Sequence, residues 1–188
     1  MPVRVELYLR NRVIRGELAT DGVRTLDRFN RHDPAITLQD AQVASFHVAV
    51  RPRALGTVRV DKSQVLLVVP DDTDEQMTLR GAWVPKKRVQ AEAGVGPLDV
   101  RGTFHLGSSP KSSLEQLLFG DEERIYIPVT NALVTCEYHQ GWSAALPTVF
   151  LMRRVVEFIT SPRPVAEHRS ELVLAVAQAS PVNGRNGH

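Results

Sequence analysis

The chain has 188 residues, of which 43% are hydrophobic, 23% charged and 6% aromatic. This apolar fraction is enough for a packed core, which excludes wholesale disorder, and the length allows one domain or two small ones. The 23 Lys and Arg residues against 21 Asp and Glu leave a net charge of +2, which disfavours a dedicated polyanion-binding protein.

The first half of the chain predicts a series of short strands and one helix. Residues 3–9 alternate apolar and polar side chains, and residues 13–18 resume the pattern after a turn at Asn11 and Arg12, so a hairpin is expected. Thr25 is a candidate cap for a short helix in which Leu26 and Phe29 share one face. Residues 35–43, 57–60 and 64–69 predict three further strands, and the last two are apolar enough that we expect burial on both faces.

The second half repeats this order at a separation of 86 to 91 residues. Strand patterns at 89–92 and 100–104 flank a glycine- and proline-containing turn at 94–97, and a helix over 112–118 is expected with Ser112 as its cap. Strands are then predicted at 124–138, 148–152 and 155–159, and the last two are again apolar enough that we expect burial on both faces. Shared order favours a tandem duplication, although β-rich chains can resemble one another by coincidence.

The predicted fold class is therefore mainly β, with two tandem small bent-sheet or barrel units that each carry a short helix. The expected boundaries are 1–72 for the first unit, 73–86 for a connector with an extra strand, and 87–162 for the second unit. Residues 163–188 are expected to form a C-terminal helix and a disordered tail.

Several polar positions of the first unit follow the order of a known motif. Gly16, Leu18, Asp21 or Asp27, Asn30, Leu38 and Asp40 resemble the first motif of Sm-like domains, and residues 58–62 echo the second. This resemblance implies a bent five-stranded sheet and rings that bind uridine-rich RNA. The second unit departs from the motif, with Leu118 in place of Asn30. The tandem arrangement is also similar to uncharacterised bacterial repeat proteins.

The sequence offers no recognisable catalytic or metal-binding constellation. The histidines lack metal-ligand spacing, and one cysteine cannot form a cysteine-rich zinc site, so neither a metal nor a cofactor is expected. Cys136 lies near His139, but a small apolar role in the core is favoured over a nucleophile. The single cysteine and the absence of a long apolar run predict a cytoplasmic protein without membrane contact.

Basic and amide side chains next to the predicted turns are the candidate contacts for RNA or a protein partner. These are Arg28, Asn30, Arg31, Arg59, Lys62, Arg153 and Arg154. The function expected from the sequence is a non-catalytic assembly or protein-interaction module, not an enzyme, and an Sm-like RNA-binding protein is the alternative. The expected partner is another protein or further copies of the chain, with RNA kept open.

Overall fold

The computed structural model describes residues 2–45, 51–71, 87–109, 111–120, 124–138 and 142–160, and every structural statement below concerns these residues. The first half contains β1 (Pro2–Tyr8), β2 (Arg12–Ala19), α1 (Thr25–Phe29), β3 (Ala35–Ser45), β4 (Arg53–Asp61), the 3-10 turn η1 (Lys62–Gln64) and β5 (Leu67–Pro70). The second half contains β6 (Lys87–Val95), β7 (Leu98–Leu106), α3 (Leu114–Phe119), β8 (Tyr126–Cys136), β9 (Ser143–Met152), η2 (Arg153–Val155) and β10 (Val156–Ile159).

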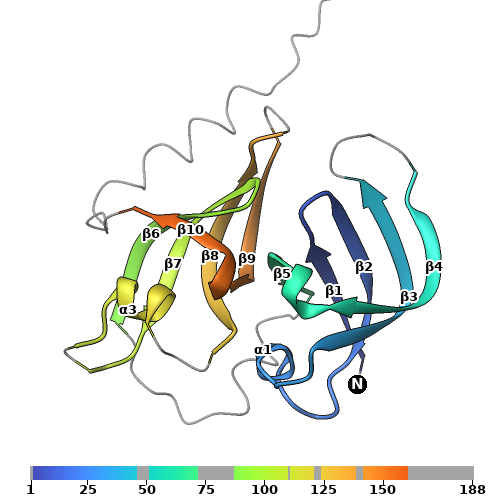
Figure 1. Cartoon of the computed structure of the whole chain (residues 1–188), viewed down its shortest axis with the longest axis horizontal. Coiled ribbons are helices and arrows are strands. Elements are labelled where there is room, and N and C mark those ends of the chain that lie inside the picture. Colours follow the sequence, from blue (N-terminus) through green and yellow to red (C-terminus); the bar gives the residue numbers. More distant parts are fainter. Residues whose placement is uncertain are drawn as a thin grey trace, which may run out of the picture.

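All strands belong to one antiparallel sheet, which confirms the prediction of a mainly β chain with short helices (Figure 1). The strand order is β10-β6-β7-β8-β9-β5-β1-β2-β3-β4, and the sheet does not close on itself. Within each half the last strand lies beside the first, and the other three follow in chain order. The halves meet where β5 pairs with β9, with Leu67 opposite Leu151 and Val68 opposite Phe150.

Both predicted hairpins are present. Leu9 N–H donates to the Arg12 carbonyl over 2.8 Å, which closes the turn between β1 and β2. The turn between β6 and β7 contains Gly96 at φ +58°, a left-handed conformation that glycine adopts without a steric penalty.

The predicted helix caps are wrong by one residue. Arg24 precedes α1 without a side-chain cap bond, and Thr25 is buried instead. Ser113, rather than Ser112, accepts the Gln116 N–H at the start of α3. In α3 the two neighbouring serines have the same capping chemistry, whereas α1 begins without a side-chain cap.

A bulge recurs at the same place in both halves. Asp40 at φ +48° lies in the third strand of the first half, and Asn131 at φ +50° lies in the third strand of the second. The facing residues are Gly16 and Gly102, where a Cβ would approach the carbonyl oxygens of Gln39 and Thr130 at 2.9 and 3.0 Å. Asn and Asp tolerate this backbone region better than other non-glycine residues, so the bulge explains the residue type at both sites.

The hydrophobic core is shared between the halves. One cluster joins Val5, Leu18, Phe29 and other first-half residues to Tyr126, Phe150 and Met152 of the second half. The other cluster, mostly from the second half, includes Tyr8, Leu66 and Leu67 of the first. Cys136 is buried in it, as predicted. Because both clusters cross the β5–β9 junction, the two halves pack as one body.

Two of the four strands expected to be buried on both faces lie instead at the ends of the sheet. Strands β4 and β10 each have one neighbour among the described strands. Most of β4 is exposed or half-buried, with only Val60 buried. In contrast, β9 is buried from Thr148 to Met152 and pairs with the other half at Phe150 and Leu151. An apolar sequence indicates that a strand favours burial, but it does not show whether another strand of the same chain lies beside it.

Some expectations lie outside the described residues. These are the connector over 73–86 with its extra strand at 77–84, the C-terminal helix and tail over 163–188, and His139.

The Tyr126 side chain bonds across the junction and predicts a pH dependence. Its hydroxyl donates to the carbonyls of Lys62 (2.9 Å) and Val65 (3.3 Å). Desolvation by burial, and secondarily the charge of Asp61, raises its pKa above the ordinary 10.0. Because the folded pKa lies above the unfolded one, this stabilisation is complete below pH 10.0 and is lost as the pH rises beyond it.

We expect Tyr126→Phe to cost about 1 kcal/mol at neutral pH, from the lost hydrogen bonds, and to flatten the decline of stability in strong alkali. Urea unfolding at neutral and strongly alkaline pH measures both effects. Tyr8, whose pKa burial also raises, titrates in the same range and leaves a residual decline in the variant. An alkaline decline as steep in Tyr126→Phe as in the parent chain would contradict this assignment.

Candidate functional site

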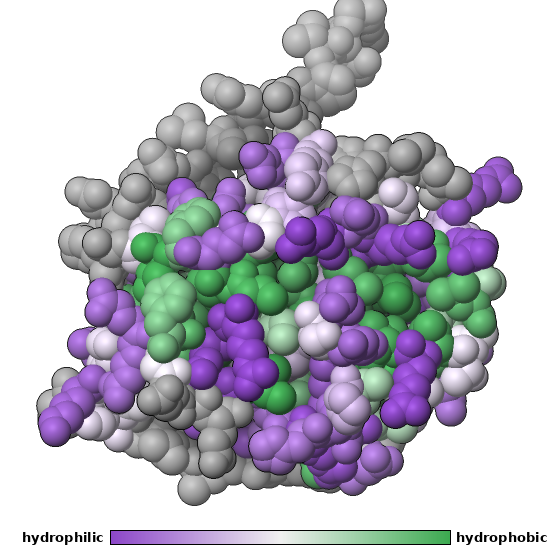
Figure 2. Space-filling view, in the orientation of Figure 1, coloured by the Kyte–Doolittle hydropathy of each residue, from purple (hydrophilic) through white to green (hydrophobic). Residues whose placement is uncertain are grey.

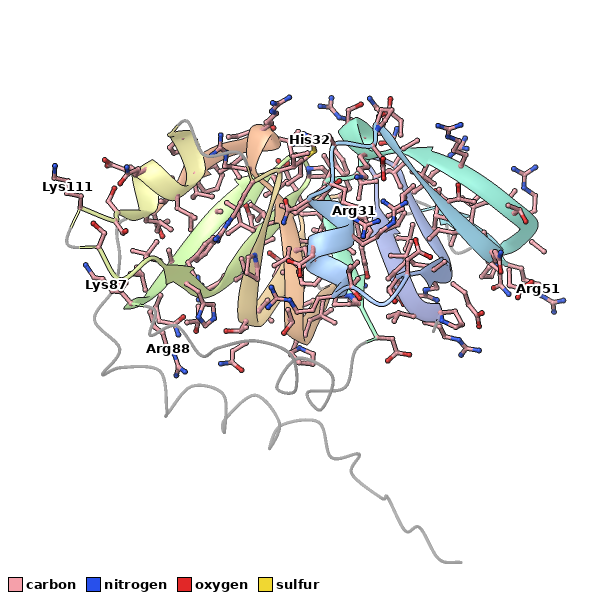
Figure 3. The ribbon with its side chains drawn as sticks, turned by 90° about the horizontal axis from the view of Figure 1, so that it is seen from below. Arg31, His32, Arg51, Lys87, Arg88 and Lys111 are labelled. Atoms are coloured by element: carbon pink, nitrogen blue, oxygen red, sulfur yellow. The ribbon has the colours of Figure 1, made fainter. Side chains whose placement is uncertain are left out.

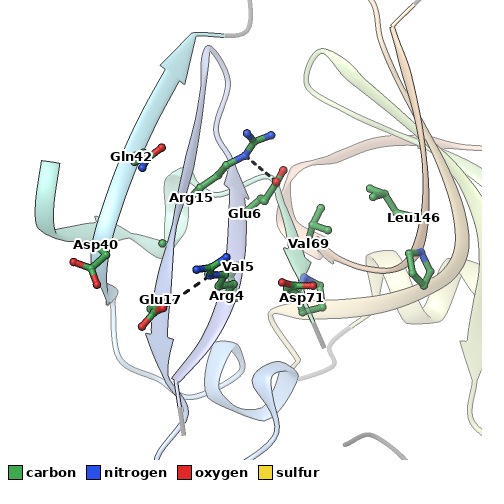
Figure 4. A pocket seen from close by; sticks show the side chains of 13 residues that line it. Arg4, Val5, Glu6, Arg15, Glu17, Asp40, Gln42, Val69, Asp71 and Leu146 are labelled. Carbon is green, nitrogen blue, oxygen red and sulfur yellow. Dashed lines mark ion pairs between the residues drawn. The ribbon is translucent and has the colours of Figure 1, made fainter. Parts of the chain in front are cut away.

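An open groove of about 990 Å³ lies over the first half beside the junction (Figure 4). Outward-facing side chains of β1, β2 and β3 line one side, and β5 and β9 contribute Val69, Pro70, Leu146 and Pro147. The charged lining residues are Arg4, Glu6, Arg15, Glu17, Asp40 and Asp71. Two guanidinium groups and four carboxylates therefore share one depression. The alternation of β1 and β2 places Arg4, Glu6, Arg15 and Glu17 on this face, whereas Asp40 lies at a bulge and Asp71 follows β5.

Two cross-strand ion pairs organise this groove. Arg15 Nε lies 2.8 Å from Glu6 Oε1, whereas Arg4 Nε lies 3.9 Å from Glu17 Oε1. Each pair joins residues directly opposite in the β1–β2 ladder. The Arg4 and Arg15 side chains are 77% and 59% exposed, so their remaining N–H groups are accessible to an anion.

The second half contains one of these two pairs at the corresponding place in its sheet. Arg101 donates to Glu92 on β6 over 2.8 and 3.0 Å, which corresponds to Arg15 and Glu6. In place of Arg4 and Glu17, Gln90 donates to Thr103 over 2.7 Å. One pair is thus common to both halves, and the second arginine and second carboxylate distinguish the first half.

Asp40 adds a carboxylate at the bulge on β3. It is exposed and lines the groove together with Gly16 on the facing strand. Asn131 has the same positive φ, so this backbone conformation is a property of the bulge in both halves. Only the first half has an ionisable side chain at that position. An Asp differs from an Asn here mainly in charge and in its ability to accept a proton.

The sequence predicted none of these groove residues as site residues; Gly16 and Asp40 appeared only as members of the Sm-like motif. A usable signal was nevertheless present. Once the β1–β2 hairpin is assigned, its register places Arg4 opposite Glu17 and Glu6 opposite Arg15 on the outward face. The bulge and the approach of β9, which complete the groove, depend on pairing between distant segments.

Lys62, one of the predicted contact residues, is buried rather than available to a partner. Its ammonium donates to the carbonyls of Phe29 (3.2 Å) and Arg31 (2.8 Å) at the end of α1. Burial lowers its pKa below the ordinary 10.5. This arrangement satisfies carbonyls that the helix leaves unpaired, which is a structural role.

Arg28 and Arg31 lie near Lys62 in the same loop. The Arg28 guanidinium is largely buried and contacts the carboxylate of Asp33 at 2.5 Å. That hydrogen bond is the main reason why the pKa of Asp33 is lowered. The structure therefore gathers Arg28, Arg31 and Lys62, but ties two of the three to partners within the chain.

Asn30 contacts the other half of the same chain. Its Oδ1 accepts the N–H groups of Ile125 (2.9 Å) and Tyr126 (2.8 Å), and its Nδ2 donates to the Tyr126 carbonyl (3.1 Å). These three bonds all reach β8 or the residue preceding it.

The remaining predicted residues lie apart from that loop cluster. Arg59 is exposed on β4 at one end of the sheet, and Arg153 and Arg154 begin η2. Arg153 N–H donates to the Ile125 carbonyl, which brings its backbone close to the Asn30 contact. Other basic side chains, including Arg51, Lys87 and Lys111, are spread along the molecule rather than gathered in one patch (Figure 3).

Two features are absent from the described part of the chain. It contains no group of three or more His, Cys, Asp or Glu residues arranged to hold a metal ion. It also contains no helix long and apolar enough to cross a membrane.

Comparison with known proteins gives one informative relative. The chain is 33% identical over 141 residues to a protein of Nostoc sp. named "Probable 2-phosphosulfolactate phosphatase". The match covers 72% of this chain and 55% of the relative, so the chain spans about half the length of the curated protein it matches. No family model matches the chain, and no solved structure gives a significant match.

This relative contradicts two expectations drawn from the sequence. Its name denotes an enzyme that removes a phosphate group, which points away from a non-catalytic assembly or interaction module and from the RNA-binding alternative. The expectation that the chain is not an enzyme is wrong for the same reason. It rested on the absence of a local catalytic motif, and a site assembled from neighbouring strands leaves no such motif.

Proposed function

We propose that this chain acts in the hydrolysis of a phosphate ester of a small hydroxy acid, of the 2-phosphosulfolactate kind. The observation that carries the proposal is the 33% identity to the Nostoc protein of that name. A phosphosulfolactate carries a phosphate, a sulfonate and a carboxylate on a three-carbon skeleton. A site for it therefore needs several cationic donors within a small space, together with a group that activates water.

The groove over the first half supplies two cationic donors. Arg4 and Arg15 lie on adjacent strands, point outward and retain accessible N–H groups. A guanidinium presents N–H donors in a planar fork that matches phosphate, sulfonate and carboxylate oxygens. The partner carboxylates hold the arginine side chains in place, and the loose 3.9 Å separation of Arg4 from Glu17 favours exchange of that partner for a ligand oxygen.

Asp40 supplies the second need in this proposal. Its carboxylate accepts a proton from a water molecule as the water oxygen bonds to phosphorus. The ester P–O bond then breaks, the hydroxy acid oxygen leaves and takes a proton from solvent, and inorganic phosphate is released. Positioned acid–base groups of this kind contribute about 10²- to 10⁴-fold in rate.

The test is release of inorganic phosphate from 2-phosphosulfolactate by the full chain, with and without an added divalent cation. Phospholactate, which lacks the sulfonate, measures how much the third anionic group contributes. Turnover faster with the sulfonated compound is the expected result. Phosphate release no faster than with heat-inactivated protein under every condition would remove the proposal.

The duplicated ion pair supplies a matched prediction for substrate binding. We expect Arg15→Ala to raise KM for 2-phosphosulfolactate roughly 10- to 100-fold, because charge-assisted hydrogen bonds contribute about 1.5–3 kcal/mol. Arg101→Ala removes the equivalent arginine outside the groove and is expected to leave KM unchanged. Steady-state kinetics of both variants decide the point, and equal effects would show that the groove is not the binding site.

We also propose that the two halves are copies of one Sm-like unit, with boundaries near 1–72 and 87–162, in a cytoplasmic protein. Support comes from the common strand order, the common bulge at Asp40 and Asn131, and the common Arg–Glu pair. The single buried cysteine fits a reducing compartment. Duplication followed by divergence accounts for a groove with two arginines in one half and a Gln–Thr pair in the other.

A further inference from the structure

Two strand edges of the sheet have no partner among the described residues. Strand β10 ends the sheet in the second half, and β4 ends it in the first. An open edge presents unpaired N–H and C=O groups that can bond to another strand. The β10 edge also carries Phe158, which is 47% exposed although it packs over Gly94.

The junction inside the chain shows how such edges fit together. Strand β5, the first-half counterpart of β10, pairs antiparallel with β9, the second-half counterpart of β4. Met152 N–H donates to the Leu66 carbonyl over 3.0 Å at one end of this ladder. All four paired side chains, Leu67, Val68, Phe150 and Leu151, are buried there.

Helix α1 reinforces that junction, and its counterpart at the open edge carries an exposed aromatic residue. Asn30, directly after α1, bonds to the start of β8 across the junction. The corresponding helix α3 ends in Phe119, which is 55% exposed. Two of the three large exposed apolar side chains of the described residues, Phe119 and Phe158, thus belong to the two elements that would repeat the junction. On the face shown in Figure 2, apolar residues form a band with polar residues on both sides.

We propose that copies of this chain join head to tail, with β10 of one copy pairing antiparallel with β4 of the next. The 3-10 turns η1 and η2 begin at Lys62 and Arg153, so equivalent residues of the two halves are aligned there. With this alignment, the β5–β9 register predicts which residues of β10 and β4 would face each other. It places Phe158 opposite Val60 of the next copy and Ile159 opposite Arg59. The interface is heterologous, so repetition gives a ring if the rotation closes and a filament if it does not.

Charge distinguishes this contact from the internal one. The transferred register places Glu157 opposite Asp61, where the internal junction has Leu66 and Met152. Arg59 lies two residues from Asp61 on the same strand face, within diagonal reach of Glu157. The contact between copies is therefore weaker than the internal junction, and it dissociates on dilution.

The first test measures assembly of the full chain by sedimentation over a wide range of concentration. Species larger than a monomer are expected, and Phe158→Asp is expected to raise their dissociation constant roughly tenfold or more. Tyr138→Asp changes an equally prominent exposed aromatic residue on the turn after β8 and is expected to leave assembly unchanged. A strictly monomeric parent chain at every concentration would overturn the proposal.

A second variant on the opposite edge guards against a folding defect at Phe158. The backbone N–H of Lys62 donates to the Pro34 carbonyl, on the side of β3. Successive N–H groups of a strand point to opposite sides, so the N–H of Arg59, three residues earlier, points to the open edge. Arg59→Pro removes that donor without removing a bond to β3, and proline is tolerated on edge strands. We expect it to weaken assembly to a similar extent while the far-ultraviolet circular dichroism stays unchanged. Assembly unaffected by Arg59→Pro would place the contact elsewhere.

Disulfide crosslinking tests the register. The double variant Arg59→Cys with Ile159→Cys places two cysteines opposite each other between copies, within disulfide range. Thr57→Cys with Ile159→Cys sets them two residues out of register, where the Cα separation of about 7–8 Å is too long. Oxidation is expected to give covalent multimers only from the first variant. Equal crosslinking of both double variants would overturn the proposed register. The result does not depend on whether the chain hydrolyses a phosphate ester.

Discussion

Replacing Asp40 by Asn is expected to lower kcat for 2-phosphosulfolactate hydrolysis by about 10²- to 10⁴-fold while leaving the fold intact. The reason is that Asn has nearly the same size and shape as Asp, but its amide cannot take a proton from water. The second half already holds an Asn at this position of the bulge, at φ +50° against +48° for Asp40. The substitution therefore transfers a residue that the same backbone already accommodates.

The matched control is Asn131→Asp, which places a carboxylate on the bulge of the second half. We expect it to change neither kcat nor KM, because no second arginine pairs beside it; Gln90 and Thr103 occupy those positions. Thermal unfolding of both variants separates a catalytic effect from a structural one. An unchanged kcat in Asp40→Asn would exclude Asp40 as the proton acceptor.

Local features of the fold could be predicted from the sequence because they depend on neighbouring residues. The alternation over 3–9 and 13–18 predicts the β1–β2 hairpin, and β1 and β2 are found at Pro2–Tyr8 and Arg12–Ala19. The spacing of Leu114, Leu117 and Leu118 predicts the buried face of α3. The cap of that helix was misplaced by one residue, since Ser112 and Ser113 have the same capping chemistry.

The relation between the halves could not be predicted in the same way. The β5–β9 ladder joins Leu67 to Leu151, and no local pattern selects that partner among many apolar strands. The same uncertainty affects the site. Asn30 was predicted as an RNA or partner contact from its place in the Sm-like motif, but its amide bonds to Ile125 and Tyr126, 95 and 96 residues away. The groove likewise needs β9 beside β5, so only its cross-strand charge pairs were accessible to sequence reasoning.

Replacing Phe29 by Ala is expected to reduce the free energy of unfolding by about 3–5 kcal/mol, the typical cost of deleting a buried aromatic ring. Phe29 is fully buried at the end of α1. Its ring contacts Tyr126 edge-on at 5.3 Å between centroids and lies 6.4 Å from Phe150. Both partners belong to the second half, so the cavity opens at the junction, and the aromatic pairs add about 0.5–1.5 kcal/mol each beyond the buried area.

Urea unfolding followed by circular dichroism and by tryptophan fluorescence measures this loss. Because both hydrophobic clusters contain residues from both halves, we expect the parent chain to unfold in one transition with coincident probes. Phe119→Ala removes a phenylalanine that is 55% exposed on α3, and we expect it to stay within about 0.5 kcal/mol of the parent in the monomer. The shared core would be contradicted if Phe29→Ala lowered the free energy of unfolding no more than Phe119→Ala does. Two separate transitions in the parent chain would also contradict it, because they would show that the halves are stabilised independently.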